Sequence, residues 1–198
     1  MTTGKELVLK ALKDKNVQYV FGYTGGAIMP IFDEMERQQC FTFIMAHHEQ
    51  GATFMAQGIS RASQTNPTPQ IGVCMATSGP GAMNLVTGIA DALMDSVPLL
   101  AITGQVATGV IATDAFQESD VVGVMMPLTK QTYMPLSADT IEETIHEAVY
   151  VAMTGRGGPV LVEIPASAGV ELYIFAGPTM RAAVQRYNLF SGGGCLPP

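Results

Sequence analysis

The chain has 198 residues, enough for one domain with a sizeable hydrophobic core. Only 14% of the residues are charged, the formal net charge is −7 and no basic run occurs, which argues against binding to nucleic acid or to an anionic membrane. Because charged residues usually make up about a quarter of a globular protein, we expect a partner to cover part of this surface.

The cysteines and the hydrophobic runs indicate the compartment. Cys40, Cys74 and Cys195 are widely spaced and form no CxxC motif, which is typical of a reduced intracellular protein. The first residues lack the apolar stretch of a signal peptide, and no apolar run approaches the ~18 residues of a membrane span. We therefore expect a soluble, cytoplasmic protein.

Segments with helical and strand-like patterns alternate along the chain as far as residue 165. In chain order we expect a helix at 3–15, a strand at 17–21, a helix through 28–35, a strand at 41–46, a helix at 48–63, a strand at 71–76, a helix at 81–94, strands at 98–103 and 130–135, a helix at 138–154 and a strand at 159–164. This alternation predicts an α/β fold, with a mostly parallel sheet of about six strands and helices on both faces.

The helical and strand-like pattern ends after Pro165. Gly-rich and Pro-rich segments follow, typical of a linker or a loosely held tail. We therefore predict one domain over residues 1–167 and a divergent tail or linker over 168–198.

Glu49 lies between the strand at 41–46 and the helix that follows it. A partly buried carboxyl at such a junction can share a proton with a ligand nitrogen. The alternative is an acid that serves only the dipole of its own helix. The adjacent His47 and His48 match no standard metal-ligand spacing, so we predict no metal site.

The segment Thr77-Ser78-Gly79-Pro80-Gly81-Ala82 follows the next buried strand. It permits close approach of the backbone to a ligand, or it is simply a tight turn that suits helix–strand packing. It is neither GxGxxG nor a P-loop, and Ser78 lacks the GxSxG context of a hydrolase nucleophile. Because ligands bind at the carboxyl ends of parallel strands, this junction and the one at Glu49 predict one shared site.

Two further segments contain candidate binding residues. In Asp114-Ala115-Phe116-Gln117-Glu118 an aromatic residue precedes an amide, a pair able to line a pocket; the alternative is a loop with a buried Phe anchor. Arg156 lies in a Gly-Arg-Gly-Gly-Pro turn, where it is available to an anion. The alternative there is an ordinary helix end followed by a turn.

Together these segments resemble one family, the thiamine-diphosphate-dependent acetolactate (acetohydroxyacid) synthases. The resemblance covers residues 4–167 and corresponds to the N-terminal pyrimidine-binding domain, which implies a flavodoxin-like three-layer fold. The segments that carry it are VFGYTGGA at 20–27, HEQGA at 48–52, ATSGPGA at 76–82 with NLVTGIA at 84–90, ITGQV at 102–106, TDAFQE at 113–118 and 154–165.

The resemblance implies a role for each matching residue. Glu49 matches the glutamate that hydrogen-bonds a ring nitrogen of the aminopyrimidine of thiamine diphosphate and takes part in activating the cofactor. The other matches are Gly25 and Gly26 in the turn near the thiazolium, Thr77, Pro80 and Asn84 around the pyrimidine, Ala27, Phe116 and Gln117 on the substrate side, and Arg156 near FAD. His47 and Thr24 depart from the usual Arg and Pro of the family.

The family decarboxylates pyruvate and condenses it with a second 2-keto acid, in branched-chain amino acid biosynthesis. Its middle domain and its diphosphate-binding domain, with the Gly-Asp-Gly motif that holds Mg²⁺, have no match in this sequence. We therefore expect the chain to be inactive alone, to need a diphosphate-binding domain or subunit in a homo- or hetero-oligomer, and to meet Mg²⁺ and FAD only there. The alternatives are a subunit of a split decarboxylase or carboligase, and a non-catalytic assembly module with the same fold.

Overall fold

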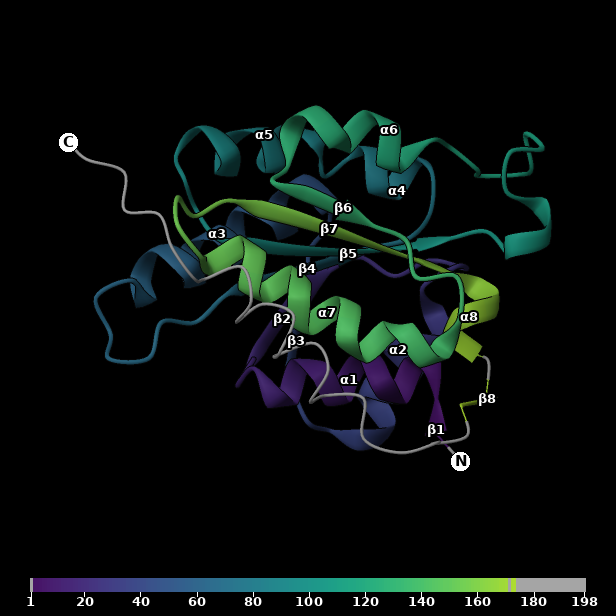
Figure 1. The fold of residues 1–198 in the computed structure, drawn as a ribbon, viewed down its shortest axis with the longest axis horizontal. Helices are drawn as coiled ribbons and strands as arrows, with labels where there is room; N and C mark the ends of the chain where they lie inside the picture. Colours follow the sequence, from purple (N-terminus) through teal and green to yellow (C-terminus); the bar gives the residue numbers. More distant parts are fainter. Residues whose placement is uncertain (1, 171, 174–198) are drawn as a thin grey trace, which may run out of the picture.

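The computed structural model describes residues 2–170 and 172–173. Its middle layer is a six-stranded sheet in the order β3-β2-β4-β5-β7-β6, and every pair of neighbouring strands is parallel (Figure 1). The strands are β2 (Tyr19–Gly22), β3 (Thr42–Met45), β4 (Gly72–Ala76), β5 (Leu99–Gln105), β6 (Gln131–Tyr133) and β7 (Pro159–Pro165). This sheet confirms the predicted α/β fold.

Helices cover both faces of the sheet and complete the three layers (Figure 1). On one face lie α1 (Gly4–Asp14), α2 (Met29–Gln38) and α7 (Ala138–Met153), and on the other lie α3 (Glu49–Ser63), α4 (Pro80–Met83), α5 (Val86–Met94) and α6 (Val121–Met125). The remaining elements are the short helix α8 (Ala166–Val170), the 3-10 turns η1 (Thr108–Val110) and η2 (Met126–Leu128), and an antiparallel pair of β1 (Thr2–Thr3) with β8 (Leu172–Tyr173).

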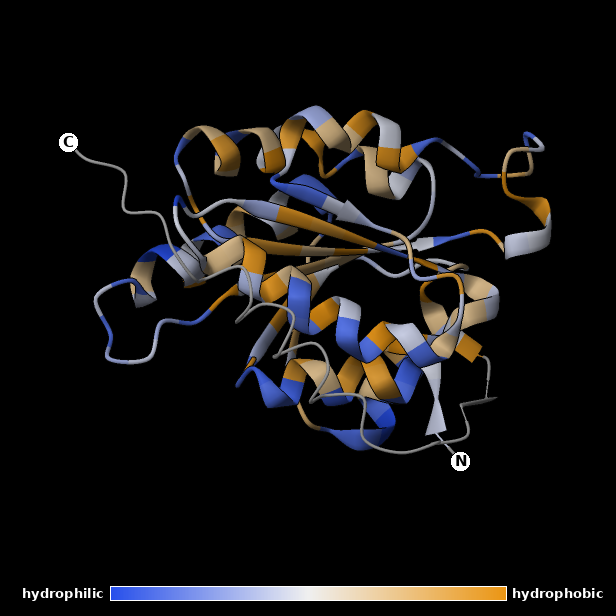
Figure 2. Cartoon of the chain, in the orientation of Figure 1, coloured by the Kyte–Doolittle hydropathy of each residue, from blue (hydrophilic) through white to orange (hydrophobic). Residues whose placement is uncertain are grey.

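Two hydrophobic cores hold the layers together, one on each face of the sheet. Alternate residues of a strand point to opposite faces, so Val73 and Met75 of β4 enter one core and Cys74 and Ala76 enter the other. Every residue of β4, β5 and β7 is buried, as expected for central strands of a parallel sheet. Figure 2 shows hydrophobic colours along the central strands β5 and β7, while hydrophilic residues colour parts of α1 and α7.

The helices differ from the predicted ones at three places, and one of them is the short helix α8, where no element was predicted. The expected helix at 81–94 is two helices, α4 and α5, separated by Asn84 and Leu85. Asn84 donates its side-chain amide to Glu49, a tertiary contact that helical periodicity does not reveal. Helix α6 was not predicted; it is short, and its N-cap residue Asp120 accepts a hydrogen bond from the backbone N–H of Gly123 at 2.8 Å.

Three further expectations concern membrane helices, the cysteines and the C-terminal tail. Among the described helices none is both long and apolar enough to cross a membrane. Cys74 is fully buried, and burial raises the pKa of its thiol to about 12, so it stays a neutral core residue. Most of the predicted tail, with Cys195, lies outside the described residues, and its boundary at 168 stays a prediction.

Candidate functional site

Glu49 is the first residue of α3, directly beyond the carboxyl end of β3, and only 7% of it is exposed. The preceding residue, His48, caps the helix, since its Nδ1 accepts from the backbone N–H of Gln50 at 3.1 Å. Asn84 Nδ2 donates to Glu49 Oε2 at 2.9 Å. One oxygen of this carboxyl is therefore fixed by the residue that separates α4 from α5.

The turns that follow β2 and β4 pack against each other beside this carboxyl. The backbone N–H of Ala27 donates to Thr77 Oγ1 at 3.3 Å, and a Cβ added at Gly25 would lie 2.6 Å from the Thr77 side chain. A Cβ at Gly81 would lie 3.2 Å from Glu49 Oε1 and 2.7 Å from Thr77 Cγ2. A larger residue at position 25 would push the two turns apart, and one at position 81 would collide with Thr77 of its own turn and crowd the Glu49 carboxyl.

These contacts bring most of the predicted cofactor residues to one end of the sheet. Pro80 is the first residue of α4, next to Gly81, and a Cβ at Gly26 would meet nothing within 4 Å. The substrate-side candidate Ala27 packs on β5, where a Cβ at Gly104 would lie 2.9 Å from the Ala27 carbonyl carbon. A nearly buried carboxyl, a hydroxyl and an amide beside small residues fit a flat polar ring such as an aminopyrimidine.

The loop at 106–120 contains the predicted substrate pair, Phe116 and Gln117. A Cβ at Gly79, where φ is +52°, would lie 2.3 Å from the Gln117 carbonyl oxygen, so this loop lies directly on the turn at 77–82. Gln105 Nε2 also holds the loop, donating to the Ser119 carbonyl oxygen at 3.2 Å. Phe116 is 88% exposed, so the alternative reading of Phe116 as a buried anchor is wrong.

Arg156 lies at the opposite end of the sheet, before the first residue of β7. Its Nε donates to Ser96 Oγ at 2.7 Å and its Nη2 to the Met94 carbonyl oxygen at 3.2 Å, so it binds the end of α5. A cation at a helix C-terminus is favourable. The structure does not bring Arg156 together with Glu49, and its contact with FAD stays a prediction.

Glu163 is a polar residue of this region that the sequence analysis did not single out. It lies in β7, is 0% exposed, and its Oε1 accepts from Gln105 Nε2 at 2.9 Å. Burial, with a smaller contribution from Asp120, raises the pKa of its carboxyl to about 8. The signal was present, because Glu163 is the one acid in the apolar run at 159–165.

A group with metal-ligand spacing lies on the other face of the sheet. Among the described residues, Asp14, Glu142 and His146 place one ligand atom each within 4.8 Å of one another. Lys10 Nζ forms ion pairs with both Asp14 and Glu142, and burial lowers the pKa of His146. An ion-pair network between α1 and α7 accounts for this group.

The comparisons with known proteins agree with this geometry. Residues 2–124 match the family described as thiamine pyrophosphate enzyme, N-terminal TPP binding domain. The acetolactate synthase large subunit of Corynebacterium glutamicum is 47% identical over 163 residues, which is 82% of this chain and 25% of that protein. The Lactococcus lactis large subunit is 48% identical over 164 residues (83% and 28%), and the isozyme 3 large subunit of Escherichia coli 43% over 165 residues (83% and 28%).

The chain belongs to the thiamine pyrophosphate enzyme family as its N-terminal TPP binding domain. This confirms the resemblance stated from the sequence motifs. The chain spans about a quarter of the length of the curated relatives named above.

Proposed function

We propose that this chain supplies the pyrimidine-binding wall of the thiamine diphosphate site in an acetolactate-synthase-like carboligase of the cytoplasm. The reaction is decarboxylation of pyruvate followed by condensation with a second 2-keto acid. The observation that carries the proposal is the Glu49 carboxyl, almost buried at a helix start, oriented by Asn84 and placed against Gly81. The similarity to acetolactate synthase large subunits supports the same assignment.

In this proposal the Glu49 carboxyl shares a proton with a nitrogen atom of the ligand ring. Asn84 fixes Oε2, while Oε1 lies toward Gly81, where the glycine leaves room for a ring nitrogen. Gly25, Gly26 and Thr77 shape the slot, and Ala27, Phe116 and Gln117 lie on the substrate side. When bound, thiamine diphosphate supplies the nucleophilic carbon that adds to the keto group and the electron sink for loss of CO₂.

The diphosphate half of the cofactor needs a second polypeptide or domain in this proposal. In the described part of the chain, the one cluster with metal-ligand spacing lies between α1 and α7, on the opposite face of the sheet from α3 and α4. We therefore assign Mg²⁺, the diphosphate and FAD to a diphosphate-binding partner with which the chain forms an oligomer. Exposed apolar side chains near the site, Tyr23, Met29 and Met45, suit such an interface.

The proposal is tested by complementation. The chain is mixed with the separately produced remainder of the C. glutamicum large subunit, thiamine diphosphate, Mg²⁺ and FAD, and acetolactate formation is measured. Glu49→Gln keeps the shape and removes the proton-sharing carboxyl, so we expect kcat to fall by about 10²-fold or more. Glu36→Gln, an exposed acid on α2, is the matched control and should leave kcat unchanged.

Two results would contradict the proposal. Full turnover of the Glu49→Gln mixture would remove the role of the carboxyl. Tight binding of thiamine diphosphate and Mg²⁺ by the chain alone, measured by calorimetry, would show that no partner is needed.

A further inference from the structure

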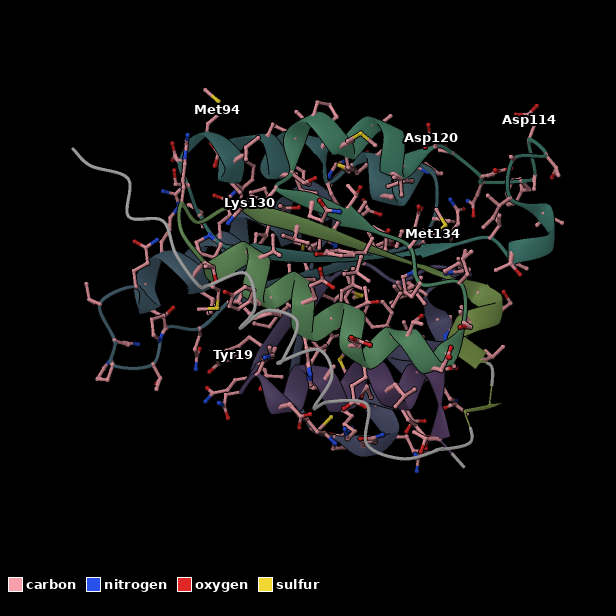
Figure 3. The ribbon with its side chains drawn as sticks, in the orientation of Figure 1. Tyr19, Met94, Asp114, Asp120, Lys130 and Met134 are labelled. Carbon is pink, nitrogen blue, oxygen red and sulfur yellow. The ribbon has the colours of Figure 1, made fainter. Side chains whose placement is uncertain are left out.

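A cavity of about 340 Å³ lies between the ends of β5 and β7 and the loop at 106–120. Figure 3 labels residues from three of the segments that line it: Asp114 in the loop, Asp120 at the start of α6 and Met134 after β6. We call it the acidic cavity; it is lined by Gln105, Ile111, Ala112, Asp114, Glu118, Ser119, Asp120, Met134 and Glu163. None of the roles proposed for Glu49 or its neighbours uses it.

Among the residues that the structure describes, four carboxyl groups and no lysine, arginine or histidine line the acidic cavity. Two of the carboxyls are engaged by the backbone: Glu118 accepts N–H bonds from Ala112, Thr113 and Ala115, and Asp120 Oδ1 accepts from Gly123. These bonds fix the two side chains in the wall of the cavity. The field inside is negative, which disfavours an anionic ligand such as a 2-keto acid.

Glu163 gives a second and independent indication of a ligand. It is 0% exposed, and its Oε1 is satisfied by Gln105, but within the described part of the chain no donor reaches its Oε2. The hydroxyl of Thr103, its register partner on β5, is also without a hydrogen-bond partner among the described residues. A buried carboxyl oxygen without a partner is costly, and a positively charged group in the cavity would satisfy it.

The spacing of the carboxyl groups selects the kind of cation. No three of the cavity's carboxyl groups have oxygen atoms within 4.8 Å of one another, so they do not converge on a bare metal ion. The ligand atoms of Asp14, Glu142 and His146 do meet that spacing. Ile111, Ala112 and Met134 add an apolar wall beside the acids. We propose that the acidic cavity binds an alkylguanidinium or alkylammonium group, with the charge at Glu163 and Asp120 and the aliphatic stem against Met134.

Binding of such a cation is coupled to release of the proton from Glu163. Because burial and Asp120 raise the pKa of Glu163 to about 8, this carboxyl holds its proton at pH 7. An arriving cation favours the ionised form, so the proton is released as the cation binds. The other titratable groups lining the cavity, Asp114, Glu118 and Asp120, are all acids and favour the cation further.

The test compares two isosteric probes on the chain alone. We expect n-butylguanidinium to bind more than about tenfold more tightly than neutral n-butylurea, because only the cation pairs with Glu163. Calorimetry in buffers of different ionisation enthalpy should show release of about one proton near pH 7. Glu163→Gln should abolish both the preference and the proton release, while Glu143→Gln, which removes an exposed acid of α7, should change neither.

A short peptide with a single central arginine, titrated in parallel, distinguishes the source of the cation. Tighter binding of the peptide than of butylguanidinium identifies a polypeptide side chain, and the reverse identifies a small molecule; both support the site. Equal affinity for the cation and the urea, or an unchanged preference in Glu163→Gln, would overturn the proposal. No thiamine cofactor is present in this measurement, so a negative result for cation binding does not contradict the proposed carboligase function. A negative complementation result likewise does not contradict the cation site.

Discussion

Two buried glutamates of this chain have opposite ionisation, and their neighbours explain why. Glu34 of α2 accepts hydrogen bonds from Arg37 and from Gln38, and the Arg37 guanidinium, helped by Gln38 and Lys5, lowers the pKa of this carboxyl to about 2. Within the described residues Glu163 has only a neutral amide as its partner, and burial raises its pKa to about 8. The presence or absence of a cationic neighbour decides the charge of each side chain.

The raised pKa of Glu163 predicts how stability changes with pH. In the unfolded chain a glutamate has its ordinary pKa of 4.5, whereas burial in the folded protein raises the pKa of Glu163 to about 8. Between these values the native state binds more protons, so the free energy of unfolding should fall as pH rises from about 4.5 to 8. Urea unfolding across this range should show a clearly smaller decrease for Glu163→Gln; the same decrease in both proteins would contradict the assignment.

At the scale of elements, the contact between the turn at 77–82 and the loop at 106–120 depends on one glycine. Gly79 has a φ of +52°, and a Cβ there would lie 2.3 Å from the Gln117 carbonyl oxygen. Any other residue therefore strains its own backbone and displaces the loop. The two elements are separated by β5 in the sequence, so this contact follows from the sheet order and not from local pattern.

Gly79→Ala should lower the free energy of unfolding by about 1–3 kcal/mol, because both the φ penalty and the clash act on the folded state. Gly58→Ala is the matched control: Gly58 is an exposed interior residue of α3 where a Cβ meets nothing within 4 Å. That change should stabilise the protein by about 0.5–1 kcal/mol. Chemical denaturation measures both, and equal effects of the two substitutions would refute the loop contact.

Much of the fold followed from patterns that act locally. The apolar runs at 17–21 and 71–76 predicted two of the strands, and a parallel sheet places the carboxyl ends of its strands at one edge. Another local pattern is the capping box at the start of α1, where the Thr3 backbone N–H donates to Glu6 Oε2 at 2.7 Å. The break at Asn84 was missed because it depends on a side chain far away in the sequence, Glu49.

The candidate site was predicted less completely than the fold. Motif order placed Glu49 and Thr77 at the same edge, but it could not show that Asn84 orients the carboxyl. Glu163 was missed although it is the one acid of an apolar run, because the strand pattern does not show that its side chain meets Gln105 beside a cavity. The resemblance placed Arg156 near FAD, and because Arg156 precedes β7 in a parallel sheet, it lies at the end opposite Glu49.

At the scale of the whole molecule, the two ends of the sheet carry different groups of polar residues. The carboxyl ends of β2 to β5 carry Glu49, Thr77 and the loop, while the other end carries Arg156, which binds α5 near Ser96 and Met94. A substitution at Arg156 should therefore act on stability without disturbing the arrangement around Glu49.

Arg156→Ala should lower the free energy of unfolding by about 0.5–1 kcal/mol, because an exposed cation at a helix end contributes little more than this. In the complemented mixture we expect unchanged affinity for thiamine diphosphate and, from the family resemblance, weaker affinity for FAD. Thermal unfolding and flavin fluorescence measure the two effects. A large loss of thiamine diphosphate affinity would mean that the two ends of the sheet are not independent.

The close contact between the Gln117 carbonyl oxygen and Gly79 joins the turn beside Glu49 to the loop at 106–120. The turn lies beside the Glu49 carboxyl and packs directly on the loop that carries Phe116 and Gln117. If a ligand that moves the turn also displaces the loop through this contact, it changes the affinity of a second ligand that contacts the loop. Thermodynamic reciprocity then requires the second ligand to change the affinity of the first by the same factor, whichever of the two arrives first.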